Sequence, residues 1–184
     1  MRRTLFENMF GLLSAVGAVL MTAAPSAVAE DVVALRQTDM KAMATAAKTI
    51  FGMFKDPANY KAAEFQKAAD TIRDRSGGVL FRHFASEVAN PQSKAMPNIL
   101  EERERFDRLA NDLRDYAVAL DAAAQNNPGP MPSGMRMKPG EAMGGGPLGT
   151  HVRSEQALSA MPAEHVFHLM LQTCTTCHVR FRTD

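Results

Sequence analysis

The C-terminal end of the chain carries the run Cys174-Thr175-Thr176-Cys177-His178, which contains both cysteines of the sequence. Residues three and four apart lie on one face of an α-helix, so the two thiols and the imidazole can meet one flat surface. This spacing is that of a haem c attachment site, in which two thioethers hold the vinyl groups and the imidazole binds the iron. The run therefore predicts one covalent haem c, and a fold that buries a macrocycle against a helix near the end of the chain.

Three other uses of a C-x-x-C pair agree less well with this position. A redox-active pair opens a helix after a strand, and no strand pattern precedes Cys174. Structural zinc needs four ligands, usually as two separated pairs, and the chain has no third cysteine. A disulfide would close a very short loop, the least stabilising kind, and would leave His178 without a role. We therefore retain haem attachment.

The first 29 residues have the pattern of a secretory signal peptide. Arg2 and Arg3 precede an apolar run of about 16 residues, which is shorter than the about 20 needed to span a membrane, and Ala27-Val28-Ala29 forms a cleavage site. We expect cleavage after Ala29 and a periplasmic location. The paired arginines also resemble a twin-arginine signal, but haem is attached to an unfolded chain after export, which favours the general secretory route.

The charge of the chain excludes one large class of partner. The sequence has 21 basic and 20 acidic residues, and loss of Arg2, Arg3 and Glu7 with the signal peptide leaves 19 of each. No basic patch of the kind that nucleic acids require is apparent. We expect no nucleic-acid partner and no stable membrane anchor.

Four stretches show apolar residues at the helical period, and no β pattern competes with them. The stretches are residues 31–55, 58–75, 97–124 and 152–182, the last interrupted near Met161-Pro162. Residues 79–91 mix apolar residues with turn formers, which indicates a loop or a short irregular helix. The prediction is an all-α fold, an antiparallel four-helix bundle with the haem near its C-terminal helix, built from one domain over residues 30–184.

Residues 127–150 interrupt this helical pattern. Half of these 24 residues are glycine or proline, which predicts a loop rather than a packed helix. The segment also holds Met131, Met135, Met137 and Met143. Thioethers can bind Cu(I), but without a cysteine or histidine in the segment we interpret it as a loop with incidental methionines.

With these features in place, the chain resembles the class II c-type cytochromes, the cytochrome c prime family of haem-binding four-helix bundles. Three segments carry the resemblance, and together they span most of residues 31–182. The family motif C-x-x-C-H-x-x-[FY]-R matches residues 174–182, close to the chain end. Arg36 to Met40 matches the family's R-x-x-x-[hydrophobe] segment on the first helix. Residues 95–99 are similar to its A-x-P-x-I-W motif, although Leu100 replaces the usual tryptophan.

The resemblance implies roles for individual residues. Cys174 and Cys177 would bind the haem covalently, and His178 would be the axial iron ligand. Met40 would face the other side of the haem, and low-spin members use a methionine there as the second axial ligand. Met43, one turn further on, is a rival, and an iron without a sixth ligand is the other alternative. Arg36 would lie near the haem propionates.

Two functions remain open at this stage. A Met/His-ligated iron would make the protein a periplasmic electron carrier with redox proteins as partners. An open sixth position would instead make it a gas-binding module for NO or CO. We expect no enzymatic activity, because no paired catalytic groups are evident.

Some aromatic and histidine residues have uses that the sequence leaves open. The family often pairs through its first two helices, and Phe51, Phe54 and Phe65 would either supply such a homodimer contact or fill the monomer core. His83, His151, His165 and His168 are expected to be surface residues rather than iron ligands.

Overall fold

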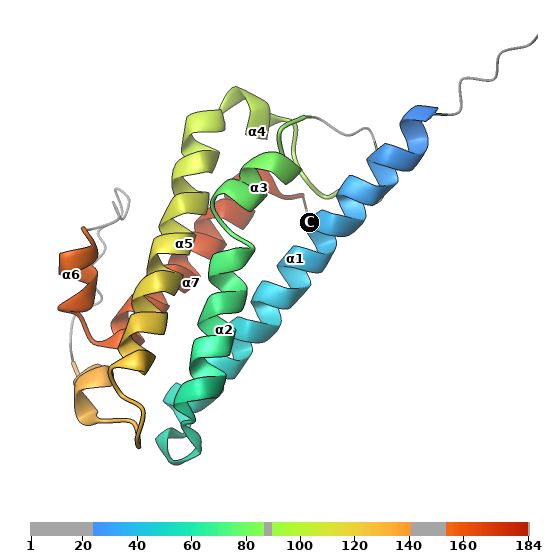
Figure 1. The fold of residues 1–184 in the computed structure, drawn as a ribbon. Helices are drawn as coiled ribbons and strands as arrows, with labels where there is room; N and C mark the ends of the chain where they lie inside the picture. The colour runs from blue at the N-terminus through green and yellow to red at the C-terminus, as the bar shows by residue number, and fades with distance from the viewer. Residues whose placement is uncertain (1–23, 87–89, 141–153, 184) are drawn as a thin grey trace, which may run out of the picture.

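The computed structural model describes residues 24–86, 90–140 and 154–183 (Figure 1). Four long helices form the body of the molecule: α1 (Ala24–Lys55), α2 (Ala62–Asp74), α5 (Arg103–Gln125) and α7 (Ala163–Phe181). The described residues contain no strand, only an isolated antiparallel bridge between Ala95 and Arg182. The predicted all-α, four-helix architecture is confirmed.

Helices α1 and α2 begin and end where local chemistry dictates. Helix α1 ends at Lys55 because Asp56 and Pro57 follow, and the Asp56 carboxylate accepts hydrogen bonds from the Ala58 backbone N–H and the Asn59 amide. The 3₁₀ turn η1 (Pro57–Asn59) comes next, so α2 starts at Ala62 rather than at the predicted residue 58. Proline at the start of this turn fits because it has no N–H to leave unpaired.

A glycine with positive φ separates α2 from the next helix. Gly77 has φ +53° and donates its N–H to the Ala110 carbonyl of α5 at 2.9 Å. Helix α3 (Gly78–His83) follows, and it is the short helix that residues 79–91 suggested. Because only glycine adopts this backbone conformation without strain, Gly77 allows the chain to turn directly onto α5.

The predicted third helix is divided in two, which corrects a single run over residues 97–124. Helix α4 (Asn98–Glu101) ends at Glu102, whose φ of −108° and ψ of 37° are not helical, and α5 then begins at Arg103. The side chain of Arg103 donates to the carbonyls of Phe81 and Phe84 at 2.8 and 2.7 Å. The kink thus places the start of α5 against the end of α3.

The C-terminal region has the predicted interruption. Helix α6 (Glu155–Ser159) and α7 are separated by residues 160–162, with Pro162 preceding α7. Within the glycine- and proline-rich segment, the 3₁₀ turn η2 (Ser133–Met135) buries Met135 in the core. Residues 141–150 of that segment lie outside the described residues, as do His151 and Met143.

The core is organised by aromatic contacts between the helices. The rings of Phe54 and Phe65 are 5.5 Å apart, and those of Phe54 and Phe167 are 5.6 Å apart, joining α1 to α2 and α7. Phe106 and Phe181 join α5 to α7 at 5.5 Å. Helix α1 packs on α2, α2 on α5 and α5 on α7. The remaining side of the bundle, between α7 and α1, is where the cavities described below lie.

The predicted signal peptide and the predicted lack of a stable membrane anchor stay predictions. Most of the proposed signal peptide, residues 1–29, lies outside the described residues. Among the helices that the structure does describe, none is long and apolar enough to cross a membrane.

We predict that Gly77→Ala destabilises the fold by about 1–2 kcal/mol, because an L-residue is strained at positive φ. The added methyl group would also lie 3.0 Å from Cδ of Arg114. Urea unfolding followed by circular dichroism measures the change. Gly52→Ala is the matched control, since Gly52 lies within α1 with no atom near the new Cβ. Alanine should stabilise that position by about 0.5–1 kcal/mol. Equal effects at both positions would contradict the argument.

Candidate functional site

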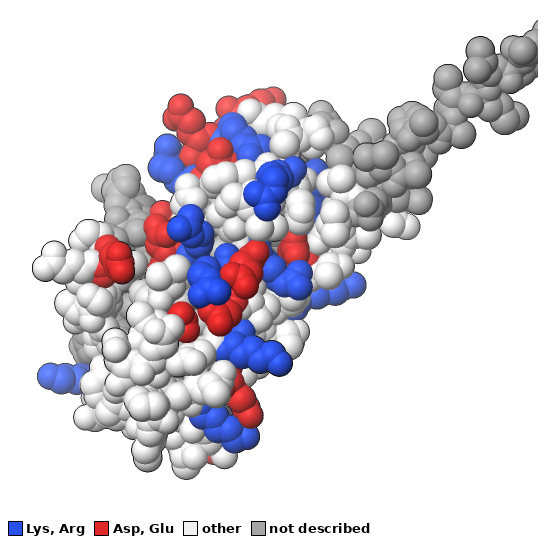
Figure 2. Space-filling view, viewed as in Figure 1, with Lys and Arg blue, Asp and Glu red and all other residues white. Residues whose placement is uncertain are grey.

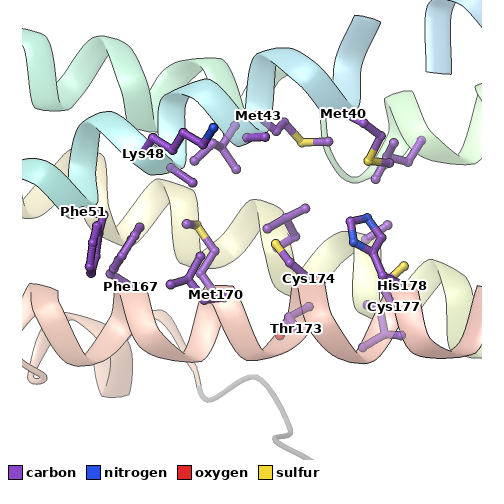
Figure 3. Close-up of a pocket in the computed structure, with 18 of the residues that line it drawn as sticks. Met40, Met43, Lys48, Phe51, Phe167, Met170, Thr173, Cys174, Cys177 and His178 are labelled. Carbon is purple, nitrogen blue, oxygen red and sulfur yellow. The ribbon is translucent and has the colours of Figure 1, made fainter. Parts of the chain in front are cut away.

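An apolar cavity of about 450 Å³ lies between α1 and α7. Its size falls within the roughly 300–1,000 Å³ typical of small-molecule sites. The walls come mainly from apolar side chains of α1, α5 and α7, among them Met43, Phe51, Leu113, Phe167 and Met170. We call this space the apolar cavity (Figure 3). It is a site for a flat or elongated apolar group held within the bundle.

Helix α7 presents the attachment motif to this cavity. Cys174, Cys177 and His178 all line it, as the i, i+3, i+4 spacing predicts. The two thiols are half-buried, while the imidazole opens into the cavity. Neither cysteine forms a disulfide. The motif is therefore arranged so that all three groups face one occupant.

Helix α1 supplies the opposite wall. In Figure 3 the Met40 side chain lies across the cavity from the His178 ring, and Met43 lies one turn further along α1, opposite Cys174. Met40 is half-buried and Met43 is buried. Both methionines predicted from the sequence therefore line the apolar cavity, and Met43 is the more buried of the two.

A second space of about 460 Å³ adjoins the first, and the two share Met40, Ala44, Phe106, Cys177 and His178 as lining residues. We call it the basic cavity, because its charged lining residues are Arg36, Lys41, Lys94 and Arg182, with no aspartate or glutamate. A group with an apolar body and anionic substituents would match the two spaces together.

The C-terminus closes one edge of the basic cavity. The Met96 N–H donates to the Phe181 carbonyl and the Thr183 N–H donates to the Lys94 carbonyl, each at 2.9 Å. Arg180 at the end of α7 also pairs with Glu102. These contacts hold residues 94–96, which precede α4, against the end of the helix that carries the motif.

Arg36 is a buried cation on the α1 side of the basic cavity. Its Nε donates to the His83 carbonyl at 2.6 Å, its Nη2 donates to the Ser86 carbonyl at 3.2 Å, and its guanidinium lies 4.4 Å from the Phe84 ring centre. Burial lowers the pKa of Arg36. Within the part of the chain that the structure describes, no carboxylate pairs with it, so an anionic substituent of a bound group would be a suitable partner.

A polar cluster that sequence reasoning missed lies beside Met40. The buried Asp39 carboxylate is 2.6 Å from Nη1 of Arg75 and 2.8 Å from Nδ1 of His83. These residues come from three helices or their ends, 36 and 44 positions apart. No local pattern indicates such a cluster. Asp39, Arg75 and His83 tie α1 to α2 and α3 next to the proposed ligand.

The apolar surroundings also change the acid–base properties of the motif. Burial raises the pKa of the Cys174 thiol, and burial together with the neighbouring Cys174 raises that of Cys177 to about 12. The pKa of His178 is lowered by burial and by the nearby Arg182. A neutral imidazole is the form that binds metal, so the cavity favours the state of His178 that haem ligation requires.

The other described histidines, His83, His165 and His168, line neither cavity. His165 is buried on α7, so its expected surface position is wrong, yet it does not line either cavity. It lies among α7 residues that pack into the core, such as Val166 and Leu169. His168 is half-buried.

The residues present fit a covalent haem. The thiols and an imidazole emerge from one helix face, the apolar cavity suits a macrocycle, and the basic cavity suits propionate groups. These features define a c-type haem protein built on a four-helix bundle.

Comparison with known proteins identifies the family. A family model described as cytochrome c′ matches residues 31–134, more than half of the chain, and the chain belongs to this family. The family binds covalent haem c, and Cys174 and Cys177 are the cysteines of its motif in this chain. That motif lies outside the matched residues, so the two observations are independent.

Solved structures agree on the fold. A cytochrome c′ from Thermochromatium tepidum is 19% identical with a TM-score of 0.60, and one from Shewanella frigidimarina is 19% identical with a TM-score of 0.57. Each match covers 85% of this chain and 97% of the other. No curated protein matches the sequence.

We predict that acid-acetone extraction leaves the haem on the polypeptide, because thioether bonds resist this treatment. Mass spectrometry should find the mass of the mature chain plus one haem. The control is the double variant Cys174→Ser with Cys177→Ser, whose haem should be extracted or absent. Colour in the solvent from the wild-type protein would contradict covalent attachment.

A second prediction concerns the cluster around Asp39. Asp39→Ala removes the carboxylate that Arg75 and His83 share, and leaving these groups without their partner should cost about 1–3 kcal/mol of unfolding free energy. Thermal or urea unfolding measures the loss. Asp74→Ala is the control, since Asp74 is exposed and, among the described residues, pairs only with Arg73. That change should stay within about 0.5 kcal/mol, and a similar loss in both variants would refute a special role for the cluster.

Proposed function

We propose that the protein is a periplasmic electron carrier whose haem iron is held between His178 and Met40. One observation carries the proposal: both residues line the apolar cavity and the basic cavity, and their side chains face each other across the space between α7 and α1. Met43 lines only the apolar cavity. The geometry therefore favours Met40 over its rival.

The surrounding residues support this role. Haem iron supplies a reversible one-electron change, and methionine–histidine ligation raises its reduction potential. Burial against the apolar walls and the nearby Arg182 lower the pKa of His178, which favours the neutral form that binds iron. Arg36, which lines the basic cavity and pairs with no carboxylate of the described residues, would hold a propionate. If His178 and Met40 both hold the iron, no site would remain there for a substrate, and we propose that the protein has no enzymatic activity.

The competing function is a gas-binding module with an open sixth position. Family membership favours this alternative, because the family is typically five-coordinate. Carbon monoxide added to the reduced protein separates the two functions. Slow or weak binding supports the electron carrier, while rapid and tight binding would support the gas-binding module.

We predict that Met40→Ala converts a low-spin six-coordinate iron into a high-spin five-coordinate one, because the thioether ligand is lost while the bundle remains. Absorption and electron paramagnetic resonance spectra report the spin state. Met43→Ala is the matched control and should lose stability, about 2–5 kcal/mol for a buried methionine, while the low-spin spectrum is kept. An unchanged spectrum in Met40→Ala would sink the ligand assignment, and a changed one in Met43→Ala would transfer the role to Met43.

The location of the protein is part of this proposal. A cleaved signal peptide over residues 1–29 would place the mature chain in the periplasm, where haem is attached to c-type cytochromes. N-terminal sequencing of the mature protein should begin at Glu30. A redox protein is the partner that an electron carrier requires, and sedimentation would decide whether two copies associate.

A further inference from the structure

A stripe of lysines runs along the exposed side of α1. Lys41, Lys48 and Lys55 recur every seven residues, which is close to two helical turns, so they lie on one face. All three are exposed, and no carboxylate within the described ranges pairs with them. We call these three residues the lysine stripe. Its ammonium groups are available to a partner.

The lysine stripe borders the opening of the haem site. Lys48 lines the apolar cavity and Lys41 lines the basic cavity. Ala44 and Phe51 lie between the lysines on the same helix face, and both also line the apolar cavity. Across the opening lie His178 of α7 and Arg182, which directly follows α7. A partner bound to the stripe would therefore lie against the edge of the haem.

The charge around this opening differs from that of the molecule as a whole. The chain has a net charge of only +1, yet α1 has no acidic residue after Asp39 and α7 has none after Glu164. Over α2 and α5, by contrast, basic and acidic side chains are interleaved (Figure 2). Ion pairs such as Arg103 with Asp107 at 2.8 Å neutralise that face. The lysine stripe is thus a local concentration of positive charge beside the cavity opening.

We infer that the lysine stripe is a docking surface for an acidic redox protein, and this inference rests on the proposed electron-carrier function. Local positive charge selects a partner with acidic groups around its own redox centre and speeds their encounter. Phe51 is 50% exposed in the middle of the stripe. An aromatic side chain among charges supplies the apolar contact that interfaces use at their centre.

Two other occupants would meet this surface less well. A second copy of the chain would need an unpaired acidic face, whereas many of the acidic residues on α2 and α5 already pair with arginines. Binding to an anionic membrane would require apolar side chains that insert into the lipid. Beside the lysine stripe, the exposed Phe51 has only Ala44 and Gly52 as small exposed neighbours, so there is little apolar area to insert. Both remain outcomes of the test.

The test measures how fast the reduced holoprotein is oxidised by two small reagents of opposite charge. One electron passes from the ferrous protein to hexacyanoferrate(III), which becomes hexacyanoferrate(II), or to a cationic cobalt(III) complex, which becomes cobalt(II). Raising the ionic strength from about 10 mM to about 0.5 M screens surface charge. We expect the rate with the anionic reagent to fall with salt and the rate with the cationic reagent to rise.

Variants locate the effect on the stripe. Lys48→Gln should lower the low-salt rate with hexacyanoferrate(III) by about two- to threefold, and Lys41→Gln with Lys48→Gln by more, consistent with electrostatic focusing. Lys67→Gln is the control, because Lys67 is exposed on α2 and lines neither cavity. Equal effects in Lys48→Gln and Lys67→Gln would overturn the inference. Rates that are fast but independent of salt would overturn it while leaving electron transfer intact, whereas slow oxidation by both reagents would count against the proposed function itself.

A binding measurement gives a second readout. Immobilised polyglutamate, a model of an acidic protein surface, should retain the wild-type holoprotein more strongly than Lys48→Gln and as strongly as Lys67→Gln. Retention that Lys48→Gln does not change would overturn the inference. So would stronger retention on anionic lipid vesicles than on polyglutamate, or self-association in sedimentation that Lys48→Gln abolishes.

Discussion

Helix α7 carries two thiols and an imidazole on one face, and the bundle must leave room in front of that face. Three sides of the bundle are closed by helix packing, α1 on α2, α2 on α5 and α5 on α7. The fourth side holds the two cavities. A cofactor bound there would contact both α1 and α7. The same apolar surfaces would therefore determine how much the cofactor stabilises the folded protein and which environment its reactive centre has.

Helix α1 is fixed at the level of the haem site by polar contacts rather than by direct packing on α7. Asp39 bonds to Arg75 and His83, and Arg36 bonds to the His83 carbonyl. Such buried polar groups are costly unless they are satisfied, and their geometry is specific. They set the rotation of α1 about its axis next to Met40, and so which side chains of α1 face His178 across the cavities.

The distribution of charge separates the two sides of the molecule. Paired charges cover much of α2 and α5, where they contribute solubility and little stability. On α1, Lys41, Lys48 and Lys55 pair with no carboxylate of the described residues, and two of them line the cavities. A carrier that must meet its partner in one orientation gains from such an arrangement, because the rate of electron transfer depends on which edge of the protein is presented.

The sequence by itself determined the cofactor and the fold class, because C-x-x-C-H chemistry and the helical period are local properties. It also placed Met40 four residues after Arg36 and spaced Lys41, Lys48 and Lys55 seven residues apart. Only the tertiary structure decided the break at Glu102, the burial of His165 and the meeting of Asp39 with Arg75 and His83. The reason is physical: these features depend on contacts between residues far apart in the chain, and no short-range pattern encodes which helices will pack together or which buried charges will find each other.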